Sequence, residues 1–330
     1  MLNQFDLDYL RSANNLSYKN LGRTGVNPSV GCIIVDYSHD RKGVIISYGL
    51  TSLNGRPHAE VNALKKIKKK SLLDNLVMYV SLEPCFKQKS CCAKLIANSG
   101  IKKVVIASID PNPLISKRGV EFLKSSGIQV ELGQRNLDQF KNINKQFYSF
   151  HFHKRPYITL KLAISKNGYT KNFKNKNITS KDTQYFMHKL RLVHDAIAVG
   201  YNTFKDDSPR LNCRLQGVEK KPVKFLISNK QQSFYGFKTI NISKFNTPND
   251  LFDFLKPYNV QSLLIEGGVK TFSYFINCNL FDEVIICQSN KNVDLSDKKY
   301  MINFENLSRK LKVKSTQKYE NDKIFIFKKN

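Results

Sequence analysis

The sequence predicts an α/β protein built from two consecutive domains. With 330 residues, the chain is longer than one typical domain. Strand-like apolar runs alternate with helical patterns through both halves, which is typical of layered α/β sheets. A helical pattern ends before Pro156, because proline disfavours helix in the residue that precedes it, and a new strand-like run follows directly. We therefore expect a first domain over residues 1–150 and a second over residues 151–330.

The first half is expected to open with an amphipathic helix over residues 5–20. Leu7, Leu10 and Ala13 recur there at three-residue spacing, which places them on one side of a helix. Apolar runs separated by polar turns predict the elements that follow. We expect strands at 30–36, 43–48, 76–82 and 104–108, and helices at 60–70, 91–99, 120–126 and 137–150.

The second half is expected to begin with a strand at residues 157–163. Further strands are expected at 195–199, 223–227, 263–265 and 283–287. No internal repeat or low-complexity linker separates these segments. The pattern therefore predicts a second β/α series.

Composition excludes several classes of protein. A hydrophobic content of 41% with 22 Phe and 15 Tyr is enough to build real cores. No apolar run approaches the roughly 20 residues needed to span a bilayer, and residues 1–6 show no secretory signal. Seven cysteines scattered over the chain do not resemble a disulfide framework. We expect a cytoplasmic protein without a membrane partner.

The net charge of +28 raises the question of a nucleic-acid partner. The excess is spread over both halves, and Lys far outnumbers Arg, whereas proteins that bind phosphates and bases rely on Arg forks. The densest run, within residues 65–70, falls at the end of an expected helix, where positive charge suits the helix dipole. The charge therefore indicates compositional drift rather than a nucleic-acid partner.

One pattern carries recognisable chemistry: His58 and Glu60 in a His-x-Glu motif, a Pro-Cys at residues 84–85, and a Cys pair at residues 91–92. It matches the signature of zinc-dependent base deaminases. One imidazole and two thiolates leave a tetrahedral zinc with an open position, where bound water becomes a nucleophile near neutral pH. The Glu then moves protons from water to the ring nitrogen and the departing ammonia. The alternative, small buried apolar cysteines, explains neither the His-x-Glu motif nor the proline.

Over nearly its whole length the chain resembles the bifunctional riboflavin-biosynthesis family, in which a diaminohydroxyphosphoribosylaminopyrimidine deaminase is fused to a 5-amino-6-(5-phosphoribosylamino)uracil reductase. In the first half the similar stretches are residues 27–32, 58–64, 82–85, 92–96 and 110–113. The resemblance implies a cytidine-deaminase-like three-layer domain followed by a dihydrofolate-reductase-like domain. It also implies hydrolytic deamination of 2,5-diamino-6-ribosylamino-4(3H)-pyrimidinone 5′-phosphate, and then NADPH-dependent reduction of the ribosyl side chain to ribityl.

For the first domain the resemblance implies one zinc ion per chain. Its ligands would be His58, Cys85 and one cysteine of the pair at 91–92, with Glu60 as proton shuttle and Asn27 against the pyrimidine. We prefer Cys92 to Cys91, since its distance to residues 99–101 is the one typical of the family.

The loop at residues 86–91 departs from the family pattern. It is shorter than usual and lacks the family's substrate-contacting His. Lys87 or Lys89 is a candidate for the substrate phosphate, because lysine acts as a flexible point charge. The alternative is that both are exposed loop lysines.

In the second half the similar stretches are residues 161–165, 178–180, 190–191, 194–197, 200, 203, 207–214 and 266–268. The implied substrate-binding residues are Arg191, Thr203, Asp207, Leu211, Arg214 and Glu266. The implied NADPH-binding residues are Ala163, Thr179, Ser180, Gly267 and Gly268. The two arginines would hold the substrate phosphate with their guanidinium forks, and the aspartate would be the catalytic acid near the sugar. The glycine pair at a helix start would admit the NADPH pyrophosphate, although such a pair alone is more often a turn.

The second half also departs from the family. Asn167 and Tyr169 stand in place of the acidic and basic residues of an Asp-Gly-Arg/Lys motif, and Asn177 replaces a usual Trp. A deaminase with an inactive second domain is therefore one alternative, and a deaminase of nucleic-acid bases is another. The joint presence of the implied Arg, Asp and Glu residues favours an active reductase. The sequence leaves open whether the chain forms a homo-oligomer and whether the intermediate passes directly between the sites.

Overall fold

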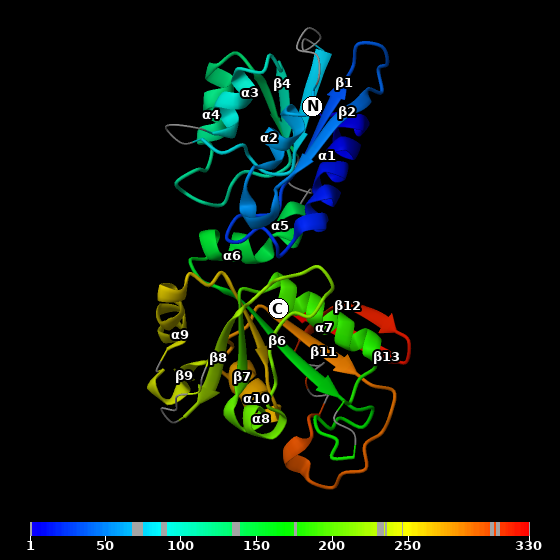
Figure 1. Ribbon diagram of the computed structural model, residues 1–330, viewed down its shortest axis with the longest axis vertical. Coiled ribbons are helices and arrows are strands. Elements are labelled where there is room, and N and C mark those ends of the chain that lie inside the picture. The colour runs from blue at the N-terminus through cyan, green and yellow to red at the C-terminus, as the bar shows by residue number, and fades with distance from the viewer. Residues whose placement is uncertain are drawn as a thin grey trace. The chain divides into compact units, whose positions relative to one another are not determined.

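The computed structural model describes residues 2–67, 75–86, 91–133, 139–174, 177–229, 234, 236–245, 247–303, 307 and 311–329 (Figure 1). The chain forms two compact units, Met1–Lys154 and Arg155–Asn330. Residue 150, where we expected the first domain to end, lies inside helix α6 (Lys145–Phe152). The second unit begins directly before Pro156.

The first unit contains a five-stranded sheet in the order β2-β1-β3-β4-β5. Its strands are β1 (Gly31–Asp36), β2 (Val44–Leu50), β3 (Leu76–Val80), β4 (Lys103–Ile106) and β5 (Gln129–Leu132). Strand β1 pairs antiparallel with β2 and β3, while β3, β4 and β5 run parallel. The C-terminal ends of β3 and β4 therefore share one edge of the sheet.

Helices cover both faces of this sheet. They are α1 (Gln4–Ser17), α2 (Ala59–Leu64), α3 (Cys92–Ala97), α4 (Arg118–Ser125), α5 (Gln139–Ile143) and α6. Leu10 of α1 packs with Ile33 on one face, whereas residues of α2, α3 and α4 cluster with Ile34 on the other. Because successive strand side chains point to opposite faces, β1 is buried on both sides and the unit has three layers.

Most elements expected in the first half are confirmed, with three differences. Strand β5 was not expected, because Gln129–Leu132 is short and half-exposed. The helix expected at 60–70 ends as α2 at Leu64, and residues 68–70 lie outside the described part. The helix expected at 137–150 is divided at Asn144, whose side chain exchanges hydrogen bonds of 2.8 and 3.0 Å with the Ser29 backbone; residues 137 and 138 are likewise outside the described part.

The second unit contains an eight-stranded sheet in the order β12-β13-β11-β6-β10-β7-β8-β9. Its strands are β6 (Tyr157–Ile164), β7 (Ala196–Gly200), β8 (Val223–Ser228), β9 (Lys238–Asn241), β10 (Ser262–Glu266), β11 (Glu283–Gln288), β12 (Lys312–Tyr319) and β13 (Asp322–Lys328). The strands from β11 to β9 in this order are parallel, and β13 is antiparallel to both its neighbours. The five expected strands are confirmed, whereas β9, β12 and β13 were not expected.

Helices flank this sheet on both faces as well. They are α7 (Lys181–Val193), α8 (Tyr201–Asp207), α9 (Pro248–Leu255) and α10 (Val269–Asn277). Phe275 of α10 and Leu251 of α9 belong to the larger apolar core, while Leu190 of α7 packs in smaller clusters with the alternate side chains of β7 and β11. This arrangement brings the C-terminal ends of β11, β6, β10 and β7 to one edge, which is where open α/β sheets bind ligands.

Candidate active sites

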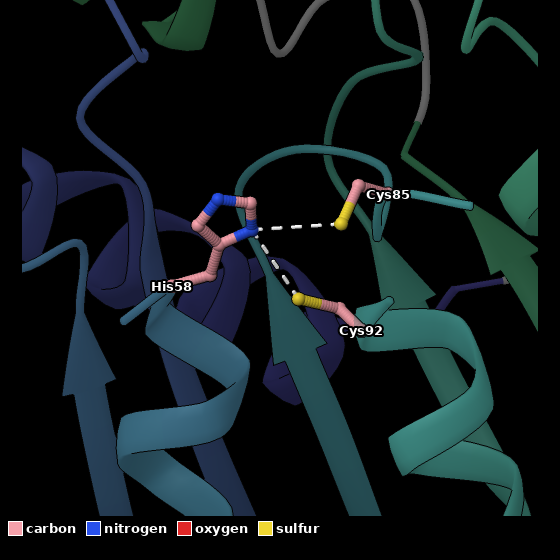
Figure 2. Close-up of side chains that lie close together, drawn as sticks. All are labelled: His58, Cys85 and Cys92. Carbon is pink, nitrogen blue, oxygen red and sulfur yellow. Dashed lines mark hydrogen bonds between the residues drawn. The ribbon is translucent and has the colours of Figure 1, made fainter. Parts of the chain in front are cut away.

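Three side chains meet beside the sheet of the first unit (Figure 2). His58 is the residue before α2, Cys85 follows β3, and Cys92 is the first residue of α3. The Sγ atoms of Cys85 and Cys92 lie 3.5 and 3.4 Å from Nδ1 of His58. All the potential ligand atoms lie within 4.8 Å of one another. One imidazole nitrogen and two sulfurs at this separation fit a single tetrahedral zinc ion with one open position.

The two adjacent cysteines have different surroundings. Cys92 directs its sulfur toward His58. Cys91 is buried in the apolar cluster that also contains Ile96 and Ile106. The geometry therefore favours Cys92 over Cys91 as the third ligand.

Glu60 lies in the first turn of α2 and is only 4% exposed. Burial is the main cause that raises the pKa of its carboxyl group to about 7. Hydrogen bonding from Cys92 and His58 lowers the pKa of Cys85 to about 4, although burial opposes this shift. An acid/base group close to neutrality beside a readily ionised thiol is suited to proton transfer at a metal site.

Asn27 is held beside the turn that leads to His58. Gly55 has a φ of +89°, and a Cβ there would come within 2.1 Å of Nδ2 of Asn27. Thr24 fixes the backbone by donating a hydrogen bond of 2.7 Å to the Asn27 carbonyl. A glycine at 55 therefore leaves room for the amide expected to contact the pyrimidine. The other candidates of this domain, Lys87 and Lys89, lie outside the described residues.

Glu83, a buried carboxylate two residues before Cys85, is a further residue of this region that the motif pattern does not single out. Its oxygens accept hydrogen bonds from the backbone N–H groups of Asp110 (3.2 Å), Lys117 (3.0 Å), Gly119 (2.9 Å) and Val120 (3.3 Å). The carboxylate thus joins the segment that carries Cys85 to the start of α4. In the sequence, the feature that could have indicated this role is a charged residue between an apolar strand and a Pro-Cys motif.

Replacing Glu83 by Gln is expected to lower the free energy of unfolding by about 2 kcal/mol, because an amide presents one acceptor oxygen where the carboxylate presents two. Thermal unfolding measures this loss. Glu121→Gln is the matched control, since Glu121 is exposed in the first turn of α4, the helix to which Glu83 is bonded. Equal unfolding temperatures for both variants would contradict the anchoring role.

In the second unit, the candidate residues gather around the C-terminal edge of the parallel strands. Ala163 is in β6, Glu266 ends β10, and Thr203 and Asp207 belong to α8, which follows β7. The glycine pair at 267–268 connects β10 to α10. The structure thus brings candidate binding residues from distant parts of the sequence to the same edge of the eight-stranded sheet.

Arg191 and Glu266 form a bidentate ion pair. Nε and Nη2 of Arg191 lie 2.6 and 2.8 Å from the Glu266 oxygens, and each side chain is 13% exposed. Burial alone would raise the pKa of Glu266, but the hydrogen bonds and charge of Arg191 outweigh it and lower the pKa. Arg191 also donates from Nη1 to the Asn212 carbonyl at 3.3 Å. Arg191 could therefore bind a phosphate only through the N–H groups that these three hydrogen bonds do not use.

The segment after α8 carries the other phosphate candidate. Leu211 is buried with a φ of +46°. Arg214 is exposed, and its Nη1 donates to Oδ1 of Asn212 at 2.7 Å. Asp207, at the end of α8, is also exposed. Both charged groups can therefore be approached by a ligand.

The start of α10 fits the pyrophosphate of a dinucleotide. Gly268 precedes this nine-residue helix, and its N–H donates to Oγ1 of Thr203 at 3.0 Å. A Cβ on Gly267 would come within 2.9 Å of Cβ of Thr271, so a larger residue would push the helix away. Glycines at a helix start leave the backbone N–H groups of the first turn accessible to an anion.

Two NADPH candidates are engaged at the start of α7. Oγ of Ser180 accepts from the N–H of Thr183 at 3.3 Å, and the Ser180 N–H donates to Asp322 at 2.7 Å. The carbonyl of Thr179 accepts from Gln184 at 3.4 Å. These contacts give Ser180 a structural role as a helix cap.

Asn167, the first departure from the family pattern, holds two loops together. Its Nδ2 donates to the Val293 carbonyl at 2.9 Å, and its Oδ1 accepts from the Val293 N–H at 3.0 Å. An aspartate could not donate the first of these bonds. Tyr169 is buried nearby, and Asn177 is exposed. The asparagine is therefore part of a well-bonded loop.

Family models match both units. That of the RibD C-terminal domain matches residues 156–325, and that of the cytidine and deoxycytidylate deaminase zinc-binding region matches residues 3–108. The riboflavin biosynthesis protein RibD of Aquifex aeolicus (strain VF5) is 33% identical over 319 residues, which cover 87% of each chain. That of Bacillus amyloliquefaciens is 31% identical over 313 residues, which cover 84% of this chain and 82% of the relative.

Solved structures match nearly the entire chain. Acinetobacter baumannii RibD, form 2, superposes with a TM-score of 0.85 at 25% identity and covers 99% of both chains. A diaminohydroxyphosphoribosylaminopyrimidine deaminase/5-amino-6-(5-phosphoribosylamino)uracil reductase from Thermotoga maritima gives a TM-score of 0.84 at 26% identity, again with 99% coverage of both. The likeness therefore extends through both units.

Proposed function

Because the chain belongs to the RibD family, the bifunctional deaminase–reductases of riboflavin biosynthesis, we propose that its two units act in turn on one small phosphorylated pyrimidine. The cytidine-deaminase-like and dihydrofolate-reductase-like folds expected for the two halves are confirmed. The proposed starting substrate is 2,5-diamino-6-ribosylamino-4(3H)-pyrimidinone 5′-phosphate. The observation that carries the proposal is the cluster of His58, Cys85 and Cys92 beside the buried Glu60.

In the first unit, the residues divide the work of deamination. His58, Cys85 and Cys92 would hold a zinc ion, which as a Lewis acid would lower the pKa of water. Glu60 accepts a proton from the attacking water and delivers protons to the ring nitrogen and to the departing ammonia. Asn27, held against Gly55, orients the pyrimidine through its amide.

In the second unit, the Gly267–Gly268 turn and the start of α10 would hold the pyrophosphate of NADPH. When bound, this cofactor would be the hydride donor for the anomeric carbon of the ribose, whose reduction opens the sugar to a ribityl chain. Arg214 binds the substrate phosphate with its exposed guanidinium, and Asp207 supplies a carboxyl group near the sugar. Arg191 acts mainly by fixing Glu266 and Asn212 at the rim of the same site.

Within the described residues, no helix has the length and apolar character needed to cross a membrane. All seven cysteines lie in the described ranges and none forms a disulfide. Free thiols support our prediction of a cytoplasmic location. The substrate is a small molecule, and a homo-oligomer remains a prediction for measurement in solution.

The direct test is to incubate the purified protein with the starting pyrimidine, with and without NADPH, and to identify the products by mass spectrometry. We expect the deaminated ribosyl compound alone without NADPH, and the deaminated ribityl compound with it. Accumulation of the deaminated ribosyl compound in the presence of NADPH would show a deaminase with an inactive second unit. An unchanged substrate would contradict the proposed function.

A further inference from the structure

One turn of α7 holds the backbone of residues 212–214, which we call the arginine segment. Nδ1 of His188 accepts a hydrogen bond from the N–H of Arg214 at 3.2 Å. The His188 carbonyl accepts from Sγ of Cys213 at 3.4 Å, and Arg191 donates to the Asn212 carbonyl at 3.3 Å. Each residue of the arginine segment is therefore bonded to either His188 or Arg191.

The chain that leads into the arginine segment has an unfavourable backbone. Ser208 and Leu211 adopt positive φ values of +42° and +46°, a region that non-glycine residues rarely occupy. Such a conformation persists only where surrounding contacts enforce it. The bonds to α7 are contacts of this kind, and they fix the place from which the Arg214 side chain extends.

The hydrogen bond that His188 accepts from Arg214 requires one protonation state of the imidazole. Nδ1 can accept from Arg214 only when it carries no proton, so the ring is neutral with its proton on Nε2. Burial lowers the pKa of His188, and the nearby charges of Arg191 and Arg214 lower it further. The neutral ring is thus the form favoured near neutral pH.

We propose that His188 is a positioning residue for recognition of the substrate phosphate. By accepting the backbone N–H of Arg214, it holds that guanidinium where the phosphate of the pyrimidine nucleotide binds. The inference rests on the reductase function proposed above and assigns to that site a residue that does not itself touch the substrate. Replacement of His188 should therefore weaken the binding only of substrates that carry a phosphate.

The test compares His188→Leu, which removes the acceptor, with His188→Asn, whose Oδ1 can take the place of Nδ1. We expect His188→Leu to raise KM for the phosphorylated, deaminated substrate by about tenfold with little change in kcat, because binding rather than the hydride step is weakened. His188→Asn should restore KM toward the wild-type value. With the dephosphorylated substrate, wild type and His188→Leu should have equal kcat/KM. Deamination by the first unit, and the unfolding temperature, report whether each variant is folded.

Several results would overturn the inference. An unchanged KM in a folded His188→Leu variant would do so, as would a His188→Asn variant as impaired as His188→Leu. An equal loss of kcat/KM on the substrate without phosphate would show a general structural role instead. If wild type binds NADPH but never oxidises it, the proposed reductase function fails and this inference fails with it; turnover by wild type separates the two cases.

Discussion

Replacing Glu60 by Gln should slow deamination by at least about 100-fold while leaving the zinc site and the fold intact. Glutamine has nearly the same shape as glutamate but cannot take up and release a proton. Glu60 is almost fully buried, and its pKa of about 7 reflects that burial. Deamination is followed by mass spectrometry of the product, and zinc content by metal analysis.

The same variant carries an internal control. NADPH-dependent reduction of the deaminated substrate should proceed at the wild-type rate, because the second unit has its own core. Glu121→Gln makes the same chemical change at an exposed position of α4 and should retain both activities. Wild-type deamination by Glu60→Gln would exclude the residue as the proton carrier.

The second large effect concerns the metal. Cys92→Ser should lose most of the bound zinc and, with it, deamination, because its sulfur lies 3.4 Å from the imidazole nitrogen of His58. Cys85→Ser should behave in the same way. Cys91→Ser is the matched control: its side chain packs among apolar residues, so zinc should stay near one ion per chain. Metal analysis of the purified variants gives the comparison.

Some loss of stability is expected in Cys91→Ser, since a buried hydroxyl replaces a thiol. Unfolding temperature must therefore be measured beside zinc content. Zinc retained by Cys92→Ser but lost by a folded Cys91→Ser would reassign the third ligand to Cys91. If all three variants retained zinc, the cluster of His58, Cys85 and Cys92 would not be the metal site.

The zinc cluster could be anticipated because its chemistry demands particular side chains. A His-x-Glu and a Pro-Cys are recognisable without knowledge of the fold, because zinc-dependent base deamination requires these residue types. For the third ligand the sequence offered only the spacing from Cys92 to residues 99–101, which resembles that of the family. The direction of each side chain depends on how the start of α3 packs, and there the structure places Cys92 beside His58 and Cys91 in the apolar cluster.

Pairings between distant segments were not predictable in the same way. Arg191 and Glu266 both stood as substrate-binding candidates, and nothing local indicates that they bond to each other across 75 residues. Strand β12 was missed because its side chains are largely exposed. It is defined by pairing with β13 rather than by an apolar run. Asn144 likewise divides a helix through a bond to Ser29, far away in the chain.

The partly buried Arg191–Glu266 pair sets a limit on how this lysine-rich sequence can evolve. Elsewhere an exposed arginine can become lysine with little consequence, since one solvated positive charge replaces another. At position 191 a lysine ammonium could not bond both carboxylate oxygens and the Asn212 carbonyl in the same planar arrangement. Loss of either partner would leave the other charge uncompensated at a place where each side chain is only 13% exposed. The two positions are therefore tied to one another, and we expect that relatives lacking the arginine also lack the glutamate.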